Sequence, residues 1–240
     1  MSHFTGTGDT AIVIPFKNEI LEAEECLLSL KKHAPFDVFL LGINNGDEAK
    51  TQDFIMRMGG EVLYFKGLNI SKMWNRGIDF CIKKGYEKFI VMNNDIIIFP
   101  QVIERIKDAL DLFFCAQPIR LEGGELNLRK VAKILGKEDS YEEGGICGPC
   151  FGLSLEGVNF LKNDGFAQGK VFDESFFLWY QDSDLLHRLN LMERPPRDIQ
   201  NAVIYHFLSK TLWKLPNWGE IVAKDGETYN RKWNVGQKNA

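Results

Sequence analysis

Short apolar runs alternate with segments of helical periodicity over the first hundred residues, and this alternation is the strongest constraint on the fold. The apolar runs are rich in β-branched residues and occupy positions 11–15, 37–43, 61–65 and 88–92. Between them apolar side chains recur at helical spacing, most clearly from Ile70 to Ile82, as on one face of a helix. Strands that alternate with helices of this length form a parallel sheet. The sequence therefore predicts an α/β fold with helices on both faces of a mostly parallel sheet.

The alternation weakens after about residue 100. The predicted elements there are a helix after Pro100, a strand at 112–119, a helix at 126–135, a mixed glycine-rich stretch at 146–155, a helix at 181–192 and a strand at 199–207. We expect one domain, with a regular half at about 10–100, a less regular half at about 101–210 and a C-terminal segment at 211–240. The stretch 120–145 is interpreted as a variable insertion that forms a lid, an acceptor-binding element or an oligomer contact.

Composition excludes several classes of protein. The 240 residues are 45% hydrophobic and 26% charged, as in an ordinary globular domain. The net charge of -4 is opposite in sign to that of a non-specific nucleic-acid binder. No apolar run reaches the roughly 20 residues of a membrane-spanning helix, and the polar N-terminus lacks the layout of a signal peptide. We therefore expect a cytoplasmic protein, and the odd number of cysteines, 5, favours reduced thiols.

Polar clusters follow three of the predicted strands, at positions 15–19, 44–47 and 93–95. Each cluster alone is interpreted equally well as an ordinary polar loop. Open parallel sheets bind ligands at the carboxyl ends of their strands, so the three together predict one ligand-binding crevice. Asp95 lies between the apolar runs FIVM and IIIF, where a carboxylate is costly unless it is paired or holds a cation. It is a candidate ligand of Mn²⁺ or Mg²⁺, the alternative being a turn residue that caps its own backbone.

Several motifs occur in an order that resembles a known family. They are AIVIPFKNE, INNG, WNRGI, MNND, a glycine-rich stretch before residue 152, FDESFFLWYQDSDLLHRL and YHF. In this order they resemble the family 2 glycosyltransferases, particularly the branch that contains rhamnosyltransferase-like enzymes. The resemblance covers about residues 10–210 and implies the GT-A fold, a Rossmann-like three-layer sandwich, spanning the chain as a single domain.

The resemblance implies a binding site for a nucleotide-sugar donor such as a UDP-, dTDP- or GDP-sugar. Its implied residues come from the first four motifs: Pro15, Phe16, Asn18, Glu19, Asn44, Asn45, Lys72, Asn75, Arg76, Asn93 and Asn94. Pro15 to Glu19 match the loop that approaches the base and ribose, and Lys72 and Arg76 are candidates to reach the diphosphate. Asn44 replaces an aspartate that usually contacts the base, and Asn93 replaces the first acid of the Asp-x-Asp metal motif.

The resemblance also implies a metal site and a catalytic base. Asp95 matches the final acid of the metal motif, and His206 matches a histidine that approaches the metal or diphosphate. Asp182 matches the base. Gln181, which replaces the usual glutamate, and Asp184 match acceptor-side contacts. The alternatives are helix-capping acids at 182 and 184 and a core histidine at 206.

Two other features have competing interpretations. Cys147-Gly148-Pro149-Cys150 has the thioredoxin tetrapeptide, but no clear amphipathic helix follows to lower a thiol pKa, and one such pair is a poor zinc site. We therefore interpret both residues as ordinary cysteines. Trp74 is predicted to be a core aromatic. Trp213, Trp218 and Trp233 either stack on a sugar or pack on the domain, and packing is favoured.

The expected function is metal-dependent, inverting transfer of a sugar to an acceptor hydroxyl. The acceptor is left open among a glycan, a lipid-linked sugar, a protein and a modified nucleic acid. One alternative is a nucleotidyltransferase, although the loop PFKNE lacks the glycines of a phosphate-binding loop. The other is a non-catalytic sugar- or nucleotide-binding module of the same fold, which the replacements at 44, 93 and 181 favour.

Overall fold

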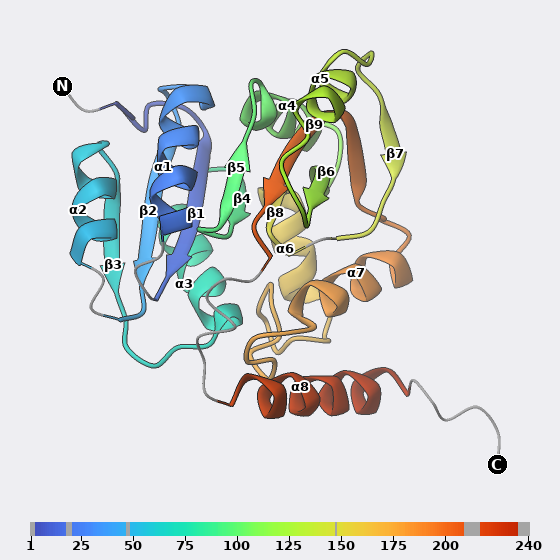
Figure 1. Cartoon of the computed structure of the whole chain (residues 1–240). Helices are drawn as coiled ribbons and strands as arrows, with labels where there is room; N and C mark the ends of the chain where they lie inside the picture. The colour runs from blue at the N-terminus through green and yellow to red at the C-terminus, as the bar shows by residue number, and fades with distance from the viewer. Residues whose placement is uncertain (1–2, 18–20, 47–48, 147, 209–216, 235–240) are drawn as a thin grey trace.

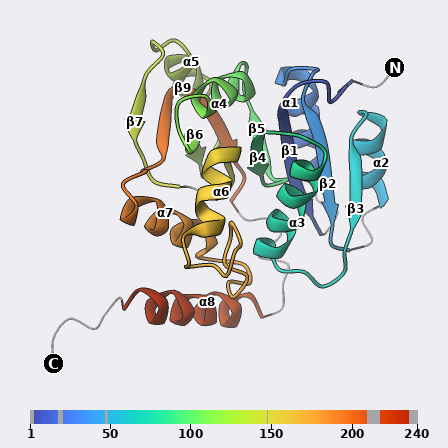
Figure 2. The same ribbon diagram turned by 180° about the vertical axis from the view of Figure 1, so that it is seen from behind.

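The computed structural model describes residues 3–17, 21–46, 49–146, 148–208 and 217–234 (Figure 1). Within these ranges the chain forms a nine-stranded mixed sheet in the order β3-β2-β1-β4-β8-β6-β9-β5, with β7 paired to β9. Helices α1 and α2 cover one face, and α3 and α6 cover the other (Figures 1 and 2). The predicted α/β fold with a mostly parallel central sheet between helical layers is confirmed.

The first half alternates as predicted. Its elements are β1 (Thr10–Phe16), α1 (Leu21–His33), β2 (Phe39–Asn44), α2 (Ala49–Arg57), β3 (Glu61–Tyr64), α3 (Ile70–Lys83) and β4 (Lys88–Met92). All four strands run parallel. Because successive side chains of a strand point to opposite faces, Ile12 and Ile14 enter one hydrophobic core and Ala11 and Val13 the other.

The second half adds antiparallel strands. Its elements are β5 (Ile96–Ile98), α4 (Val102–Leu110), β6 (Cys115–Glu122), α5 (Leu128–Leu135), β7 (Tyr141–Glu143), β8 (Cys150–Ser154), α6 (Leu155–Asn163), α7 (Gln181–Leu191), β9 (Arg197–His206) and α8 (Trp218–Trp233). Strand β8 lies between β4 and β6 and is antiparallel to both. This insertion joins the two halves into one continuous sheet.

Strand β7 and helix α6 of the second half escaped prediction, and the stretch 120–145 proved to be part of the sheet and core. Strand β7 has three residues, too few for periodicity to identify, and α6 carries Gly157 in its first turn, a residue that weakens a helical pattern. Helix α5 packs Val131 and Ile134 into the main core, and β7 pairs with β9, so this stretch is integral to the domain.

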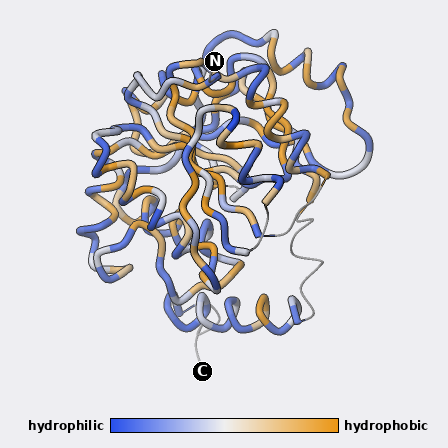
Figure 3. The backbone as a smooth tube through the Cα atoms, turned by 90° about the vertical axis from the view of Figure 1, so that its left-hand side faces the viewer, coloured by the Kyte–Doolittle hydropathy of each residue, from blue (hydrophilic) through white to orange (hydrophobic). Residues whose placement is uncertain are grey.

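Helix α8 lies beyond the edge at which β1, β2 and β3 end, beside α7 (Figure 1). Most of its residues are hydrophilic, in contrast to the apolar strands in the interior (Figure 3). Such a helix has no strong apolar stripe for sequence analysis to detect. None of the described helices has both the length and the apolar character required to cross a membrane.

Candidate active site

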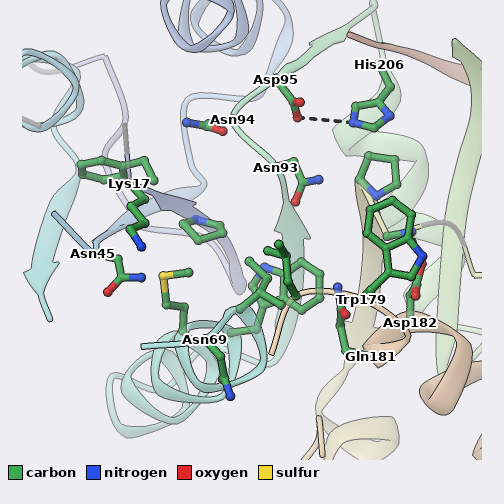
Figure 4. Close-up of a pocket in the computed structure, with 18 of the residues that line it drawn as sticks. Lys17, Asn45, Asn69, Asn93, Asn94, Asp95, Trp179, Gln181, Asp182 and His206 are labelled. Atoms are coloured by element: carbon green, nitrogen blue, oxygen red, sulfur yellow. Dashed lines mark hydrogen bonds and ion pairs between the residues drawn. The ribbon is translucent and has the colours of Figure 1, made fainter. Parts of the chain in front are cut away.

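A cavity of about 380 Å³ opens at the carboxyl ends of β1, β2 and β4 (Figure 4). Its volume is within the range of small-molecule sites. The three polar turns predicted from the sequence all contribute to its lining, with Pro15, Phe16, Lys17, Asn45, Asn93, Asn94 and Asp95. The opposite wall comes from the second half and includes Arg120, Glu122, Trp179, Gln181, Asp182 and His206.

Asp95 and His206 meet at one end of this cavity. Strands β5 and β9 are antiparallel with Ile96 opposite His206, and the Phe207 amide donates a hydrogen bond to the Asp95 carbonyl at 3.0 Å. This pairing places His206 Nε2 3.4 Å from Asp95 Oδ1, with side-chain exposures of only 6% and 4% (Figure 4). The backbone of the sheet therefore determines how these two side chains approach each other.

The imidazole of His206 has unsatisfied bonding capacity. Neither ring nitrogen has a hydrogen-bond partner among the described residues, and Glu122 Oε2 lies 3.8 Å from Nδ1. Buried polar atoms without partners are rare in native proteins. A carboxylate oxygen beside an available imidazole nitrogen suits Mn²⁺ or Mg²⁺, so the two side chains fit a divalent cation. The described residues contain no cluster of three or more such side chains around one point, so other ligands would be substrate or water oxygens.

Asp182 lies on the opposite wall, in the first turn of α7. Its Oδ2 accepts a hydrogen bond from the Gly148 amide at 3.0 Å, and its Oδ1 accepts one from the Ser183 amide at 2.8 Å. Burial raises the pKa of this carboxyl above its ordinary value, and this outweighs the lowering effects of those amides and of the Arg120 charge. A raised pKa makes the carboxylate a stronger base.

Some of the residues predicted to bind the nucleotide line the cavity, and others do not. Pro15, Phe16, Asn93, Asn94 and Asn45 line the cavity. The side-chain amide nitrogen of Asn94 is buried and has no partner among the described residues, so it is available to a ligand.

Asn45 is already fully engaged. Its amide donates to the Leu68 carbonyl at 2.7 Å and accepts from the Leu68 amide at 2.9 Å, so it holds the cavity wall in place. Asn44 is outside the lining: its amide donates to Gln52 at 3.1 Å and accepts from Gly46 at 2.9 Å.

The Asn-Arg-Gly segment of α3 does not line the cavity either. Asn75 donates to the Phe172 carbonyl at 2.9 Å and accepts from its amide at 3.0 Å, which ties α3 to the second half. Arg76 is exposed over the Phe65 ring, and Lys72 is also absent from the lining. Asn18 and Glu19 lie outside the described residues.

The two predicted acceptor-side residues, Gln181 and Asp184, differ in their surroundings: one lines the cavity and the other does not. Gln181 lines the cavity, and its Oε1 is buried with no hydrogen-bond partner in the described part of the chain. Asp184 is fully buried away from the cavity. It accepts a hydrogen bond from Trp233 Nε1 at 2.9 Å and pairs with Lys232 Nζ at 2.8 Å, so its contacts join α7 to α8.

Sequence reasoning missed Arg120 and Glu122, which end β6 inside the cavity. Glu122 is the parallel partner of His206 in the β6–β9 ladder, and its Oε2 pairs with Arg120 Nε at 3.1 Å. The only available signal was a charged pair at the end of a predicted strand, which does not identify a partner strand. Among the described residues, the lysine and arginine side chains that line the cavity are those of Lys17 and Arg120.

Among the described aromatic and cysteine candidates, Trp74 and Cys150 pack in the interior, Trp233 is half-buried and stacks on His187, and Trp218 is exposed. Trp74 has an exposed fraction of 1% and packs against Phe172 with ring centroids 4.9 Å apart, although it also borders the cavity. Cys150 is buried in β8, where burial raises its thiol pKa. A buried thiol that resists ionisation is a poor redox group. Cys147 and Trp213 lie outside the described residues.

No protein-family model matches this chain, and no curated protein sequence does either. Solved structures match its fold. GalNAc-T7, solved with UDP, GalNAc and Mn²⁺, has a TM-score of 0.64 and 12% identity over 82% of this chain and 43% of its own. S. aureus TarS has a TM-score of 0.60 and 12% identity over 96% of this chain and 44% of its own. TarS 1-349 has a TM-score of 0.58 and 12% identity over 97% and 74%. This chain thus spans less than half the length of the first two, and it has the GT-A fold.

Proposed function

We propose that this protein is a glycosyltransferase that moves a sugar from a nucleotide-sugar donor to an acceptor hydroxyl with inversion at the anomeric carbon. The observation that carries the proposal is that Asp95, His206 and Asp182 line one cavity. The GT-A fold and a neighbour solved with UDP and Mn²⁺ support it. The ordered motifs support a place in the rhamnosyltransferase-like branch of family 2.

The first half of the chain would bind the donor nucleotide. Pro15 and Phe16 provide an apolar surface for the base, and the free Asn94 amide provides a hydrogen-bond donor. Lys17 and Arg120 bring positive charge to the cavity, which favours the diphosphate. Asn44 carries no charge, and its side chain is hydrogen-bonded to Gln52. It therefore gives no electrostatic preference for one base, and UDP-, dTDP- and GDP-sugars are all candidates.

Asp95 and His206 would hold Mn²⁺ or Mg²⁺ beside the diphosphate. Such a cation, when bound, neutralises charge on the leaving nucleoside diphosphate. Asp95 contributes a carboxylate oxygen, and His206 contributes Nε2, the ring nitrogen nearer Asp95. Glu122, near Nδ1, favours the tautomer that leaves Nε2 free.

Asp182 would act as the general base. Its carboxylate takes the proton of the acceptor hydroxyl while that oxygen forms a bond to the anomeric carbon. The bond from the anomeric carbon to the diphosphate oxygen breaks, and the electron pair leaves with the nucleoside diphosphate. Attack on the face opposite the leaving group inverts the anomeric centre. The buried Oε1 of Gln181 would accept a hydrogen bond from an acceptor hydroxyl.

A thermal-shift screen with UDP-, dTDP- and GDP-sugars, each with and without Mn²⁺, tests this function. We expect at least one nucleotide sugar to raise the melting temperature only with Mn²⁺, and release of its nucleoside diphosphate to follow. Binding without release, even with candidate glycan acceptors, would favour a non-catalytic module. Pyrophosphate release from a nucleoside triphosphate and a sugar phosphate would indicate a nucleotidyltransferase instead.

A further inference from the structure

The one buried side chain of α8 is a carboxylate. Asp225 has an exposed fraction of 2%. Burying a carboxylate is costly unless hydrogen bonds replace its water. Its Oδ1 accepts a bond from the Phe177 amide at 3.0 Å, and its Oδ2 accepts bonds from the amides of Leu178 at 2.8 Å and Trp179 at 2.9 Å. The backbone amides of three consecutive residues thus all donate hydrogen bonds to this one side chain.

These three residues form a wall of the candidate active site. Phe177, Leu178 and Trp179 all line the cavity, immediately before Gln181 and Asp182. Figure 4 shows Trp179, Gln181 and Asp182 together on the side of the cavity opposite Lys17 and Asn45. The carboxylate of α8 therefore holds the segment that leads directly into the proposed base.

Helix α8 also supports the turn that follows this wall. Tyr180 has a φ of 67°, an unfavourable left-handed conformation for a bulky residue. Its ring stacks on Tyr229 of α8 with centroids 5.2 Å apart. A Cβ atom at Gly226 would lie 3.3 Å from the Tyr180 ring. Helix α8 thus contacts the short segment 177–180 in three ways: through the hydrogen bonds of Asp225, the ring of Tyr229 and the close approach at Gly226.

We propose that Asp225 is a positioning residue that holds the 177–179 wall so that Trp179 and Asp182 face the acceptor. This inference rests on the proposed glycosyltransferase function. Asp95 and His206, at the proposed metal end of the cavity, are held separately by the pairing of β5 with β9. Binding of the nucleoside diphosphate should therefore not depend on the contact of Asp225 with residues 177–179.

The first test compares Asp225→Asn, Asp225→Ala and the control Glu227→Gln, which changes an exposed acid on the same helix. The asparagine variant presents an amide donor to backbone donors and loses part of the contact, and the alanine variant loses all three bonds. We expect turnover of the nucleotide sugar selected by the screen to fall about 10-fold and about 100-fold, as for misplaced catalytic groups. The affinity for the nucleoside diphosphate of that sugar, with Mn²⁺, should stay within about 2-fold of wild type, because Asp225 is not among the residues proposed to contact it.

A second variant separates positioning from stability. Gly226→Ala replaces a helical glycine with a better helix former, so the melting temperature should stay level or rise. The added methyl group pushes the Tyr180 ring, and turnover should still fall. Wild-type turnover in both Gly226→Ala and Asp225→Asn would overturn the inference. A loss of turnover that only parallels a lower melting temperature would also overturn it.

Amide hydrogen exchange gives a readout that does not require activity. The amides of 177–179 should be protected in wild type and in Glu227→Gln, and they should exchange faster in Asp225→Ala while the β5–β9 amides do not. Equal protection in all three proteins would refute the contact itself. Absence of turnover by the wild-type protein, with normal protection, would instead refute the proposed function, and the positioning role would fall with it.

Discussion

His206 Nε2 lies 3.4 Å from Asp95 Oδ1, although the two residues come from opposite halves of the chain. The β5–β9 register places Ile96 opposite His206, and the bond from the Phe207 amide to the Asp95 carbonyl continues that pairing. Backbone pairing therefore sets the relative position of these two side chains, as the proposed metal site requires.

Removal of either side chain should abolish metal-dependent nucleotide binding. For His206→Ala and Asp95→Asn, we expect the nucleoside diphosphate of the donor selected by the screen, with Mn²⁺, to lose its stabilising effect, which is worth about 2.7 kcal/mol at a hundredfold excess over Kd. EDTA should have the same effect on the wild-type protein. His33→Gln, at the end of α1, is the matched control and should behave as wild type. Retention of the Mn²⁺-dependent shift in His206→Ala would exclude this residue as a ligand.

Asp182→Asn should separate catalysis from binding. Loss of a general base lowers turnover by roughly 10²–10⁴-fold, whereas the nucleoside diphosphate of the donor selected by the screen, with Mn²⁺, should bind normally because its proposed contacts are Asp95 and His206. Steady-state kinetics and calorimetry measure the two quantities. Turnover at the wild-type level in this variant would remove Asp182 from the role of base.

The raised pKa of Asp182 gives a direction for the pH dependence. Burial favours the protonated carboxyl, and the base must be ionised to accept a proton. Turnover should therefore fall as the pH drops through a midpoint above 3.8, the ordinary value for this carboxyl. Asp182→Asn should lack this limb of the pH profile. A midpoint at or below the ordinary value would contradict the effect of burial.

The same pKa shift predicts how stability depends on pH. The folded state holds this proton to a higher pH than the unfolded state, so the contribution of Asp182 to stability is present at low pH and is lost as the pH rises through the raised pKa. The difference in unfolding free energy between wild type and Asp182→Asn, followed by chemical denaturation against pH, measures it. A difference that grows in favour of wild type as the pH rises would contradict this sign.

Asp184 should behave differently from Asp182. It is buried against Lys232 and Trp233, and removing one member of a buried ion pair costs roughly 3–5 kcal/mol. Asp184→Ala should therefore lower the unfolding free energy by about that amount in urea denaturation, whereas Asp184→Asn keeps a hydrogen-bond acceptor for Trp233 and should lose less. Equal stability of Asp184→Ala and wild type would contradict this structural role.

Gly77 permits the close approach of α3 to β1. A Cβ atom there would lie 2.4 Å from Val13 Cγ1, so Gly77→Ala should destabilise the protein by about 1–3 kcal/mol through overpacking. The matched control is Gly219→Ala in α8, where a Cβ meets no atom within 4 Å. Thermal denaturation should show a lower melting temperature for the first variant only. An unchanged value for Gly77→Ala would mean that the helix shifts freely.

The sequence alone predicted much of the fold because the first half consists of long, regular elements. The α3 pattern from Ile70 to Ile82 and the buried runs of β1 and β4 carry their own periodicity. The polar turns after β1, β2 and β4 were predicted to share one crevice because parallel strands end at the same edge. The placement of Asp95 at that edge followed from the same rule.

Tertiary structure decided what lies opposite that edge. The approach of His206 to Asp95 depends on β9 returning antiparallel to β5, and the entry of Arg120 into the cavity depends on the pairing of β6 with β9. The contact between Asp225 and the 177–179 wall involves backbone amides, which no residue pattern encodes. Local sequence determines whether a segment is helix or strand through short-range periodicity, whereas partners distant in the chain are chosen by the packing of the whole sheet. For that reason periodicity could assign the polar turns of the first half to one crevice in advance. On the second wall, Gln181, Asp182 and His206 were suggested only by the family resemblance, and Arg120 and Glu122 were missed.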